Sequence, residues 1–455
     1  MDMQRVVIIG TGYVGLTTGV MLAHLGHHVT GVDKDPAKIA LLKAGRCPIH
    51  EPGLQELMAD VRGRLEFVDD ASSAVGEADV LVIAVGTPCR ADGNADTASV
   101  EVAARDVAEN MQDGKKYTVV VKSTVPIGAN RRVVHIIEDV LRRRGATATA
   151  RCASNPEFLR EGQALYDTFY PDRIVVGTED SEALETLRAL YRPVLEQTFA
   201  PPRFLPRPQH FPLPPVITTD STSAEMIKYA SNAFLAMKIS FANEVAALCE
   251  RVGADILEVT RGMGLDPRIG SRFLQAGLGW GGSCFPKDTA ALIALGREHG
   301  CPMALVEATR QVNFAQRQRL VDRLQDELKG LRGRVVGVLG LAFKPGTDDL
   351  REAAALDVVK IMVDRGTHVR VHDPVVLGPA RQALSEWDVE FVDDPYALAE
   401  GADALFLATE WPEYRELNLV RLSSGMRTRV LMDARNLFAP DAAREAGFTY
   451  LGVGR

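Results

Sequence analysis

The sequence predicts an α/β protein in which two doubly wound parallel sheets are joined by a central helical domain. Two Val-rich stretches, RVVIIG from Arg5 and RVVGVLG from Arg334, each lead into a glycine turn, a helix and a second strand that ends in aspartate. A long helical pattern over Thr218–Gly253 lies between them. Continuous apolar strands that alternate with helices are typical of buried parallel sheets. We therefore expect two Rossmann-like domains around a helical centre.

The first stretch contains a dinucleotide-binding fingerprint. Strand Arg5–Ile9 is followed by G-x-G-x-x-G at Gly10, Gly12 and Gly15, which opens a helix, and the next strand ends at Asp33. Such glycines let the backbone approach a pyrophosphate at the helix N-terminus, and an acidic residue at this spacing binds a ribose hydroxyl. A carboxylate disfavours a 2′-phosphate, so we expect NAD as the cofactor.

Further β-α units complete the first domain. DVLVIAVGTP reads as a buried strand, a helix is expected over about Ala98–Met111, and YTVVVKSTVPIG reads as the next strand. The following segment APPRFLPRPQHFPLPP is rich in proline and cannot form regular structure, so we expect an extended surface loop or linker.

The helix over Thr218–Gly253 is expected to be a buried spine. Asp220, Ser221 and Thr222 are candidate N-caps, and Gly253 ends the pattern. About thirty helical residues would span roughly 45 Å. Because this helix is apolar nearly all round, it should be buried between domains or between subunits.

The second Val-rich stretch repeats the strand–turn–helix–strand order of the first but lacks the G-x-G-x-x-G fingerprint. Its turn is a longer loop with Lys344, Gly346 and an acidic pair. The predicted domains are an N-terminal NAD-binding Rossmann domain (1–200), a proline-rich loop or linker (201–217), a central helical domain (218–330) and a C-terminal Rossmann-like domain (331–455).

Composition narrows the possible partners. The net charge is -8 and no block of like charges occurs, which argues against nucleic acid or a membrane surface as the main partner. No apolar run approaches the roughly 18 residues of a membrane span. The six cysteines lack C-x-x-C spacing and the nine histidines lack metal-ligand spacing. We expect reduced thiols, a cytoplasmic location and no structural metal.

Two pairs of polar residues have helical spacing. Lys228 and Asn232 are four residues apart in an apolar helix, where a lysine needs a partner or a function. Taken alone, Lys228 is more typical of a salt-bridged lysine; in chemistry the pair would donate to an oxyanion. Glu157 and Glu161, also four apart in NPEFLREG, are on spacing alone more typical of a solvated surface.

Cys284 stands in the glycine-rich stretch GLGWGGSCFPKD. A lone cysteine is usually an inert buried residue. Here Pro286 suits the first turn of a helix, so the thiol would sit at a helix N-terminus with Lys287 near, which favours the thiolate. Beside a dinucleotide domain, this pattern suggests oxidation through a covalent thioester. The glycines would leave room for substrate around the sulfur.

These motifs, in this order, resemble those of the UDP-glucose 6-dehydrogenases within the UDP-glucose/GDP-mannose dehydrogenase family. The resemblance covers nearly the whole chain and rests on GTGYVGL, GTPCRADG, KSTVPIG, NPEFLREG, the Lys228–Asn232 helix, GWGGSCFPKD and GLAFKPGTDDLRE. It implies two successive NAD-linked oxidations of a nucleotide sugar at C6, from alcohol to acid, with Cys284 forming a thiohemiacetal and then a thioester. YPDRIVVG after NPEFLREG favours UDP-glucose as the substrate.

The resemblance also implies roles by motif position. The implied catalytic residues are Cys284, Lys228, Asn232, Asp288, Thr124 and Glu161. The implied cofactor-binding residues are Gly10, Gly12, Tyr13, Val14, Gly15, Asp33, Lys38, Thr87, Thr124, Glu161, Lys287 and Arg351. The implied substrate-binding residues are Glu157, Phe158, Leu159, Arg160, Glu161, Lys228, Asn232, Arg268, Ile269, Gly270, Ser271, Arg272, Phe273, Gly281 and Lys344. A homodimer is expected, with Arg268 supplied to the partner's site.

Three alternatives stay open on the sequence. The enzyme could oxidise GDP-mannose or another nucleotide sugar, because relatives with those substrates share the cysteine motif. It could be a two-electron β-hydroxyacid-type dehydrogenase, which needs no cysteine. It could also be a nucleotide-sugar-binding protein that has lost turnover.

Overall fold

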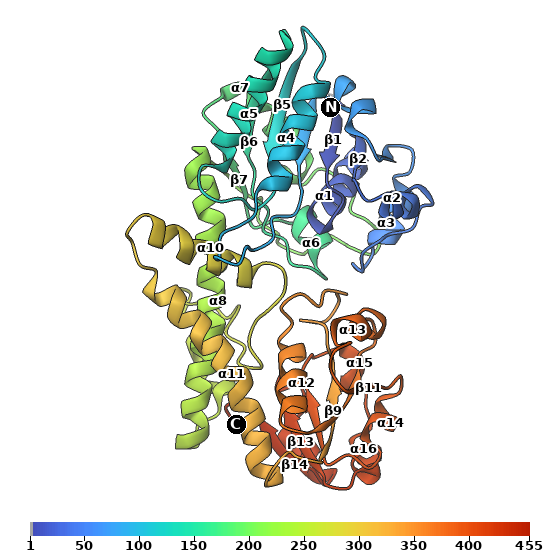
Figure 1. Cartoon of the computed structure of the whole chain (residues 1–455), viewed down its shortest axis with the longest axis vertical. Coiled ribbons are helices and arrows are strands. Elements are labelled where there is room, and N and C mark those ends of the chain that lie inside the picture. Colours follow the sequence, from blue (N-terminus) through green and yellow to red (C-terminus); the bar gives the residue numbers. More distant parts are fainter. Residues whose placement is uncertain (1–2) are drawn as a thin grey trace. The chain divides into compact units, whose positions relative to one another are not determined.

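The computed structural model describes residues 3–455, and the chain divides into two compact units, Met1–Ala230 and Ser231–Arg455. The boundary falls inside one long helix, α8 (Ser221–Val252), so each unit contains part of it (Figure 1). The predicted boundary at 217/218 therefore differs from the division that packing produces. The first turns of α8 pack with the first sheet, and the rest packs with the helices that follow.

Unit 1 is built on an eight-stranded sheet with the order β3-β2-β1-β4-β5-β6-β7-β8. Its strands are β1 (Arg5–Ile9), β2 (His28–Val32), β3 (Leu65–Val68), β4 (Val80–Ile83), β5 (Lys116–Val121), β6 (Thr149–Ser154), β7 (Ile174–Gly177) and β8 (Val216–Thr219). The first six follow the doubly wound order that places ligands at the carboxyl ends of the strands. The β6–β7 pairing is antiparallel, and all the others are parallel.

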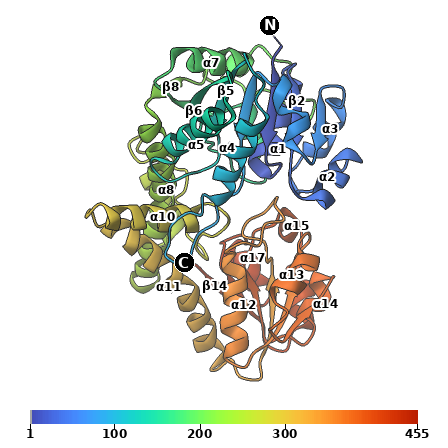
Figure 2. The same ribbon diagram turned by 45° about the horizontal axis from the view of Figure 1, so that its top comes forward.

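Helices cover both faces of this sheet (Figure 2). They are α1 (Tyr13–His24), α2 (Pro36–Lys43), α3 (Leu54–Asp60), α4 (Ala98–Asn110), α5 (Ala129–Arg144), α6 (Ala164–Phe169) and α7 (Ser181–Leu195). Val6 and Ile8 of β1 pack with α1, α3, α6 and α7, whereas Val7 and Ile9 pack with α4 and α5. Alternate side chains of a strand point to opposite faces, so an apolar run such as VVII fits only a strand covered on both sides.

The proline-rich segment 201–217 is a mostly exposed surface loop, one of the two forms expected, and it is anchored on unit 1. Its last residues belong to β8, which pairs with β7. Phe204 lies so close to Gly53 that a Cβ there would be 2.1 Å from the ring. The Tyr170 hydroxyl donates to the carbonyl of Leu205, and the rings of Tyr170 and Phe211 are in contact. The segment lacks regular structure, as predicted, but its aromatic side chains fix it in place.

Unit 2 contains a six-stranded parallel sheet with the order β11-β10-β9-β12-β13-β14, the same winding as the first six strands of unit 1. Its strands are β9 (Val335–Leu339), β10 (His368–His372), β11 (Val389–Phe391), β12 (Ala404–Leu407), β13 (Val430–Asp433) and β14 (Thr449–Gly452). Its helices after α8 are α9 (Ile256–Gly264), α10 (Phe285–Glu298), α11 (Ala304–Leu328), α12 (Ala354–Asp364), α13 (Leu377–Ala383), α14 (Pro395–Ala399), α15 (Pro412–Arg415), α16 (Leu419–Gly425) and α17 (Pro440–Glu445).

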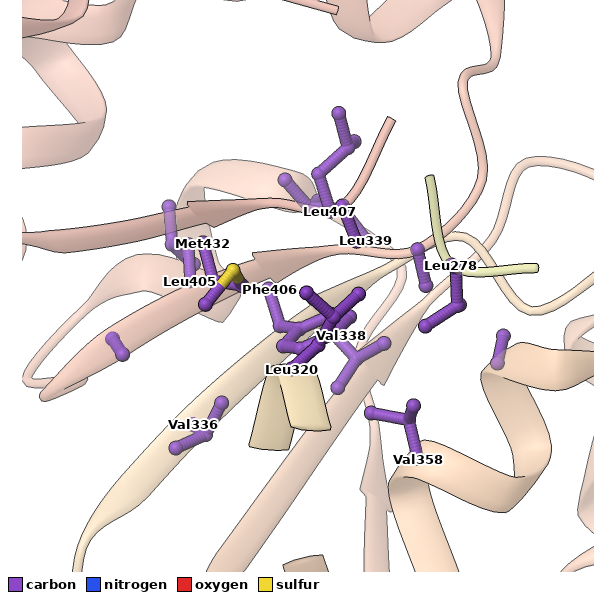
Figure 3. Close-up of a cluster of buried hydrophobic side chains, with 14 of the residues drawn as sticks. Leu278, Leu320, Val336, Val338, Leu339, Val358, Leu405, Phe406, Leu407 and Met432 are labelled. Carbon is purple, nitrogen blue, oxygen red and sulfur yellow. The ribbon is translucent and has the colours of Figure 1, made fainter. Parts of the chain in front are cut away.

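One apolar core joins this sheet to the central helices. Val338 and Phe406 of the sheet lie in the same cluster as Leu320 of α11, Val358 of α12 and Leu278 of the cysteine loop (Figure 3). The cysteine loop is therefore anchored through Leu278 to the same core as the second sheet, so the central helices and the C-terminal sheet form one unit.

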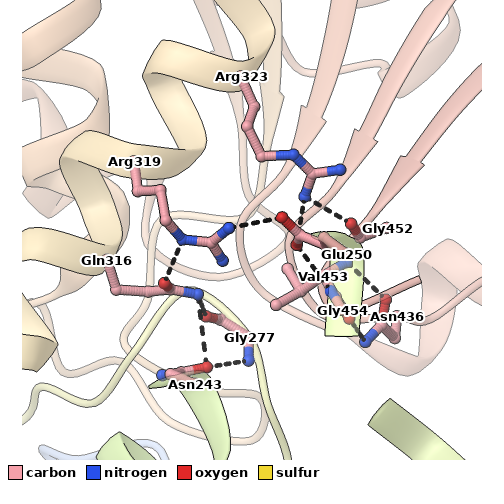
Figure 4. Close-up of polar contacts among 10 residues, drawn as sticks. All are labelled: Asn243, Glu250, Gly277, Gln316, Arg319, Arg323, Asn436, Gly452, Val453 and Gly454. Atoms are coloured by element: carbon pink, nitrogen blue, oxygen red, sulfur yellow. Dashed lines mark hydrogen bonds and ion pairs between the residues drawn. The ribbon is translucent and has the colours of Figure 1, made fainter. Parts of the chain in front are cut away.

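A polar network ties the end of the chain to the central helices (Figure 4). The Glu250 carboxylate of α8 accepts from Arg319 at 2.6 Å, from Arg323 at 2.7 Å and from the Gly454 amide at 2.8 Å. One turn before Arg319, Gln316 donates to the carbonyl of Gly277 at 2.7 Å. The network therefore holds both the C-terminal tail and the start of the cysteine loop against α8 and α11.

We expect Glu250→Ala to lower the free energy of unfolding by about 2–3 kcal/mol, because it leaves two half-buried guanidinium groups and one amide without their acceptor. Urea unfolding measures the change. Glu258→Ala, which removes an exposed ion pair with Arg261, is the matched control and should change the free energy by less than about 1 kcal/mol. Equal effects of the two substitutions would contradict a structural role for the network.

Candidate active site

The turn after β1 requires glycine because its backbone path leaves no room for a Cβ. A Cβ at Gly15 would lie 1.8 Å from the carbonyl oxygen of Gly10, and Gly10 has a φ of +100°. α1 begins at Tyr13, and no side chain of the described residues caps its N-terminus. α1 therefore begins directly after the glycine turn, and a helix N-terminus in this position is the kind of site that binds a pyrophosphate.

Asp33 follows β2 at the position expected for a ribose-binding carboxylate. Its Oδ2 accepts from the Thr11 amide and hydroxyl and from Lys38 Nζ, at 3.0, 2.8 and 2.9 Å. Burial raises the pKa of Asp33, but Lys38 and Thr11 outweigh it and hold this pKa below its ordinary value. The carboxylate is therefore ionised and fixed, and the predicted residue Lys38 is bound to it.

Two further predicted residues meet at the carboxyl edge of the sheet, where β4 and β5 end. The Thr87 hydroxyl donates to the carbonyl of Thr124 at 2.7 Å. The Thr124 loop is held from α8 as well, because Glu225 accepts from the amides of Gly128 and Asn130 at 2.6 and 2.8 Å. The sequence analysis missed Glu225, although it stands one helical turn before Lys228.

Glu157 and Lys228 form a buried ion pair in unit 1. Lys228 Nζ lies 2.8 Å from Glu157 Oε1, and the two side chains are only 3% and 5% exposed. Burial raises the pKa of Glu157, yet Lys228, the Leu159 amide and Lys122 together lower it below its ordinary value. Spacing alone favoured a solvated surface for Glu157, and that interpretation is wrong. The buried lysine of α8 has its partner.

The remaining residues of NPEFLREG surround this pair. The Phe158 ring has the Arg173 guanidinium 3.7 Å from its centre and Lys228 Nζ at 5.4 Å. Arg160 binds Asp167 through its side chain and its amide. Glu161 is half-buried and is not part of the Glu157–Lys228 pair.

A second buried glutamate holds the same loop, and the sequence analysis did not single it out. Glu51 accepts from the amides of Gly162 and Ala164 at 2.6 and 2.7 Å. The preceding carbonyl, that of His50, accepts from the Tyr13 hydroxyl at 3.0 Å. The turn sequence HEPG was the available signal, because a glutamate beside Pro-Gly in a loop has no helical partner to satisfy it.

In unit 2, Cys284 is the N-cap residue of α10, and Pro286 lies in the first turn as predicted. The half-buried thiol therefore sits at the positive end of the helix dipole, with the Ser283 hydroxyl 3.4 Å from its sulfur. Lys287, expected near the thiol, directs its Nζ to Asp288 Oδ1 at 2.5 Å. The Cys284 thiol therefore lies at a helix N-terminus, as expected, and this position favours its thiolate form.

Asp288 is buried and joins two predicted residues. Its Oδ2 accepts from Asn232 Nδ2 at 2.6 Å while its Oδ1 accepts from Lys287. Asn232 comes one turn after Lys228 on α8. Lys228 belongs to unit 1 and Asn232 belongs to unit 2. Cys284, Asp288 and Asn232 therefore belong to a single arrangement within unit 2.

The glycines of the cysteine loop have a different role from the one expected. A Cβ at Gly281 would lie 2.1 Å from the carbonyl oxygen of Glu352, and one at Gly279 would lie 2.5 Å from Asn313 Oδ1. The neighbouring backbone of Trp280 is fixed by Asn313, which accepts from its amide at 2.8 Å. These glycines thus let the loop pass against other parts of unit 2, and the expectation that they also leave room for substrate stays a prediction.

The remaining predicted residues of unit 2 lie in two loops. Lys344 is half-buried, and Arg351 is held by Asp349, while its carbonyl accepts from the Gly282 amide at 3.0 Å. The Arg268 side chain is 88% exposed and pairs only with Asp266 among the described residues. The rest of that loop comprises Ile269, Gly270, Ser271, Arg272 and Phe273; the Phe273 ring contacts Phe285, beside Cys284.

The second sheet has an aspartate at the position that Asp33 occupies in the first sheet, but its hydrogen-bond partners differ. Asp373 follows β10 as Asp33 follows β2, but its Oδ2 accepts from the amides of Leu341 and Ala342 and from Trp411 Nε1, at 2.8, 3.1 and 3.0 Å. Its other oxygen accepts two more amides. Donors of unit 2 itself therefore occupy the Asp373 carboxylate.

Neither a metal-binding cluster nor a membrane-spanning helix is found in residues 3–455. These residues contain no group of three or more His, Cys, Asp or Glu side chains that could hold a metal ion. Over the same range, no helix has both the length and the apolar character needed to cross a membrane.

Comparisons with known proteins agree along the whole chain. Three models of the UDP-glucose/GDP-mannose dehydrogenase family match it: the NAD binding domain over residues 4–195, the central domain over 222–315 and the UDP binding domain over 337–440. A UDP-glucose 6-dehydrogenase of Rhizobium meliloti is 47% identical over 99% of this chain and 100% of its own length. One from Bacillus subtilis is 42% identical over 100% of this chain and 94% of its own. The solved structure of a UDP-glucose dehydrogenase from Pyrobaculum islandicum has a TM-score of 0.87 and 42% identity, covering 100% of this chain and 98% of that one.

We expect Lys228→Met to lower the free energy of unfolding by about 3–5 kcal/mol at pH 7, because it leaves a buried carboxylate unpaired. The pKa of Glu157 in the folded chain lies below its ordinary value of 4.5, so its stabilisation is present above that pH and is lost as the pH falls through the folded pKa. Urea unfolding at pH 7 and near pH 4 measures both effects. Lys43→Met, at an exposed position, is the control; if its cost matched that of Lys228→Met, the pair would not be stabilising.

Proposed function

Because the chain belongs to the UDP-glucose/GDP-mannose dehydrogenase family, we propose that it is a UDP-glucose 6-dehydrogenase, an NAD-dependent enzyme that oxidises UDP-glucose to UDP-glucuronate. The observation that carries the proposal is Cys284 as the N-cap residue of α10, with Asp288 and Asn232 bonded beside it. A two-electron β-hydroxyacid-type dehydrogenase would have no use for a cysteine in this position. The cytoplasm is the compartment we propose, since the reaction needs Cys284 as a free thiol.

The residues of unit 1 fit NAD. The uncapped N-terminus of α1 accepts the pyrophosphate, and the fixed Asp33 carboxylate offers its Oδ1 to a ribose hydroxyl while disfavouring a 2′-phosphate. Thr87 and Thr124 follow β4 and β5, on the other side of β1 from Asp33 at the same carboxyl edge. When bound, NAD takes up a hydride, which is two electrons with one proton.

Cys284 acts as the nucleophile of the second oxidation. In the first, the C6 alcohol loses a hydride and a proton and becomes an aldehyde. The Cys284 thiolate then adds to the aldehyde carbon and forms a thiohemiacetal, which loses a second hydride to leave a thioester. Water hydrolyses the thioester to a carboxylate and restores the thiolate. One water is consumed and three protons are released, one by the alcohol and two by the water.

Groups on consecutive turns of α8 stabilise the charge that these steps develop. Lys228 is protonated through its pair with Glu157 and donates to the sugar oxygen as it becomes negative. Asn232 donates its amide to the same class of oxygen, and its bond to Asp288 fixes the orientation of that amide. We assign Asp288 and Thr124 to holding the hydrolytic water, and Glu161 to the cofactor side of this water network.

Substrate contacts are assigned to loops of each unit separately. We assign the sugar to residues 157–161, whose backbone Glu51 and Asp167 fix. We assign the UDP portion to Lys344 and Gly281 of unit 2. The loop of residues 268–273 completes the site, with the exposed guanidinium of Arg268 reaching a partner subunit.

A homodimer is proposed because α8 leaves one apolar face uncovered within the chain. Phe234, Phe241 and Leu248, each seven residues apart, are 57%, 49% and 59% exposed. Seven-residue spacing places them on one stripe, which a second copy of the same helix can cover. Exposed Leu265 and Phe314 add to the apolar surface of unit 2. An apolar face that is exposed in the single chain fits the second of the two burial sites expected for α8, between subunits.

The wild-type enzyme should release about two NADH for each UDP-glucose consumed, because the aldehyde is oxidised before it leaves. Absorbance at 340 nm with limiting UDP-glucose measures the ratio. Cys284→Ser should lower turnover to acid by more than about 10³-fold, since an alcohol is a far weaker nucleophile than a thiolate. A ratio near one would refute the thioester route. Faster turnover of GDP-mannose in a panel of nucleotide sugars would reassign the substrate.

Phe241→Asp should convert the dimer to a monomer, because it places a charge in the middle of the apolar stripe. Sedimentation velocity at micromolar concentration measures the change. Val102→Asp, at an exposed position of α4 in unit 1, is the control and should leave the dimer intact. A wild-type chain that sediments as a monomer would rule out this interface.

A further inference from the structure

Lys122 is a buried lysine that no step of the proposed reaction uses. It directly follows β5, and it is 8% exposed. Its Nζ lies 3.1 Å from Asn155 Oδ1 and 3.5 Å from the Tyr191 hydroxyl. Asn155 donates its own Nδ2 to the carbonyl of Val175, so its oxygen is fixed toward the lysine. Both hydrogen-bond partners of Lys122 are therefore neutral.

Glu157, which Lys228 already binds, lines the same pocket as Lys122. Lys122 lowers the pKa of Glu157 through its charge alone, whereas Lys228 does so through its charge and a hydrogen bond. Among residues 3–455, no carboxylate forms a salt bridge with Lys122. Lys122, Lys228 and Glu157 therefore form a buried cluster of two cations and one anion.

Each of the other two cations around this cluster, Arg160 and Arg173, has an aspartate whose negative charge offsets it. Arg160 binds Asp167 at 2.6 Å, and Arg173, stacked on Phe158, is adjacent to Asp172, whose charge acts on it. Tyr191 of α7 is the remaining titratable side chain against Lys122, and its hydroxyl donates to Asn155 at 2.8 Å. After these pairings the cluster retains one net positive charge, and an uncompensated buried charge is costly to folding.

A polar pocket of about 70 Å³ lies beside the cluster, lined by Lys122, Asn155, Glu157, Tyr191, Arg173 and Thr18 among others. The Thr18 hydroxyl is buried and has no hydrogen-bond partner in the described part of the chain. Lys122 has three N–H donors and only the two neutral acceptors. The pocket has room and partners for a few water molecules, which lower the cost of burying this charge.

We propose that Lys122 is a positioning residue that keeps the Glu157 carboxylate ionised, so that Lys228 remains protonated and aligned toward the sugar oxygen. This role rests on the proposed function, in which Lys228 stabilises an oxyanion. With Lys228 as its single cation, the Glu157 carboxylate would take up a proton more readily, and protonated Glu157 would no longer hold the Lys228 ammonium in an ion pair. The second cation makes protonated Glu157 less favourable, and the excess positive charge matches the negative charge that each oxidation develops.

The first test is the pH dependence of kcat/KM for UDP-glucose in the full-length enzyme. Lys122→Met should move the midpoint of the acid limb upward by roughly one pH unit, because removal of a nearby cation raises the pKa of Glu157. It should lower kcat at pH 7 by about tenfold or more and change KM little. Lys122→Arg keeps the charge and should restore the wild-type midpoint, and Lys43→Met, which removes an exposed charge, should leave it unchanged. An unshifted midpoint in Lys122→Met would overturn the proposal.

A second measurement does not depend on catalysis and covers the case in which Lys122→Met folds poorly. A double-mutant cycle of Lys122→Met and Glu157→Gln is followed by urea unfolding at pH 7. If the two charges are coupled, Lys122→Met has a less favourable effect on the free energy of unfolding in the wild type than in Glu157→Gln, where the carboxylate that Lys122 faces has lost its charge. Additive effects would overturn the proposal. If the wild type fails to oxidise UDP-glucose, the proposed function fails, and the cycle still decides whether Lys122 acts on Glu157.

Discussion

The buried ion pair between Lys228 and Glu157 is the interaction on which the arrangement of unit 1 depends. A charge this deep is tolerated only with a partner, so the helix that carries Lys228 and the loop that carries Glu157 must adopt one relative position. Glu225, one turn earlier on the same helix, fixes the Thr124 loop by the same means. Three segments that are distant in sequence are thus brought together by buried carboxylates of α8 and its neighbours.

The same helix continues into unit 2, where its next turn presents Asn232 to Asp288. There too a buried carboxylate is shared, between Asn232 and Lys287, and Asp288 stands in the first turn of the helix that Cys284 caps. Glu225, Lys228 and Asn232 of α8 are thus each bound to a segment that carries candidate site residues.

The two sheets show how one fold can bind different ligands. Both have the same strand order, and both place an aspartate after the second strand. In unit 1 this aspartate is held by one threonine and one lysine and retains free acceptor capacity; in unit 2 backbone amides and Trp411 occupy it. The winding is therefore shared, and the loop after the first strand decides whether the sheet edge is open to a dinucleotide.

The sequence by itself determined the winding of both sheets, the glycine turn, Asp33 and the position of Cys284 at a helix start. These features follow from local patterns: apolar runs, glycine spacing and a proline in a first helical turn. Only the tertiary structure decided that Glu157 is buried with Lys228, that Lys287 binds Asp288, and that the glycines of the cysteine loop serve close packing. The same holds for Glu51, Glu225 and Lys122, and for the proline-rich segment that packs on unit 1. Each of these depends on contacts between residues far apart in the chain, and burial of a charge has no signature in the residues next to it.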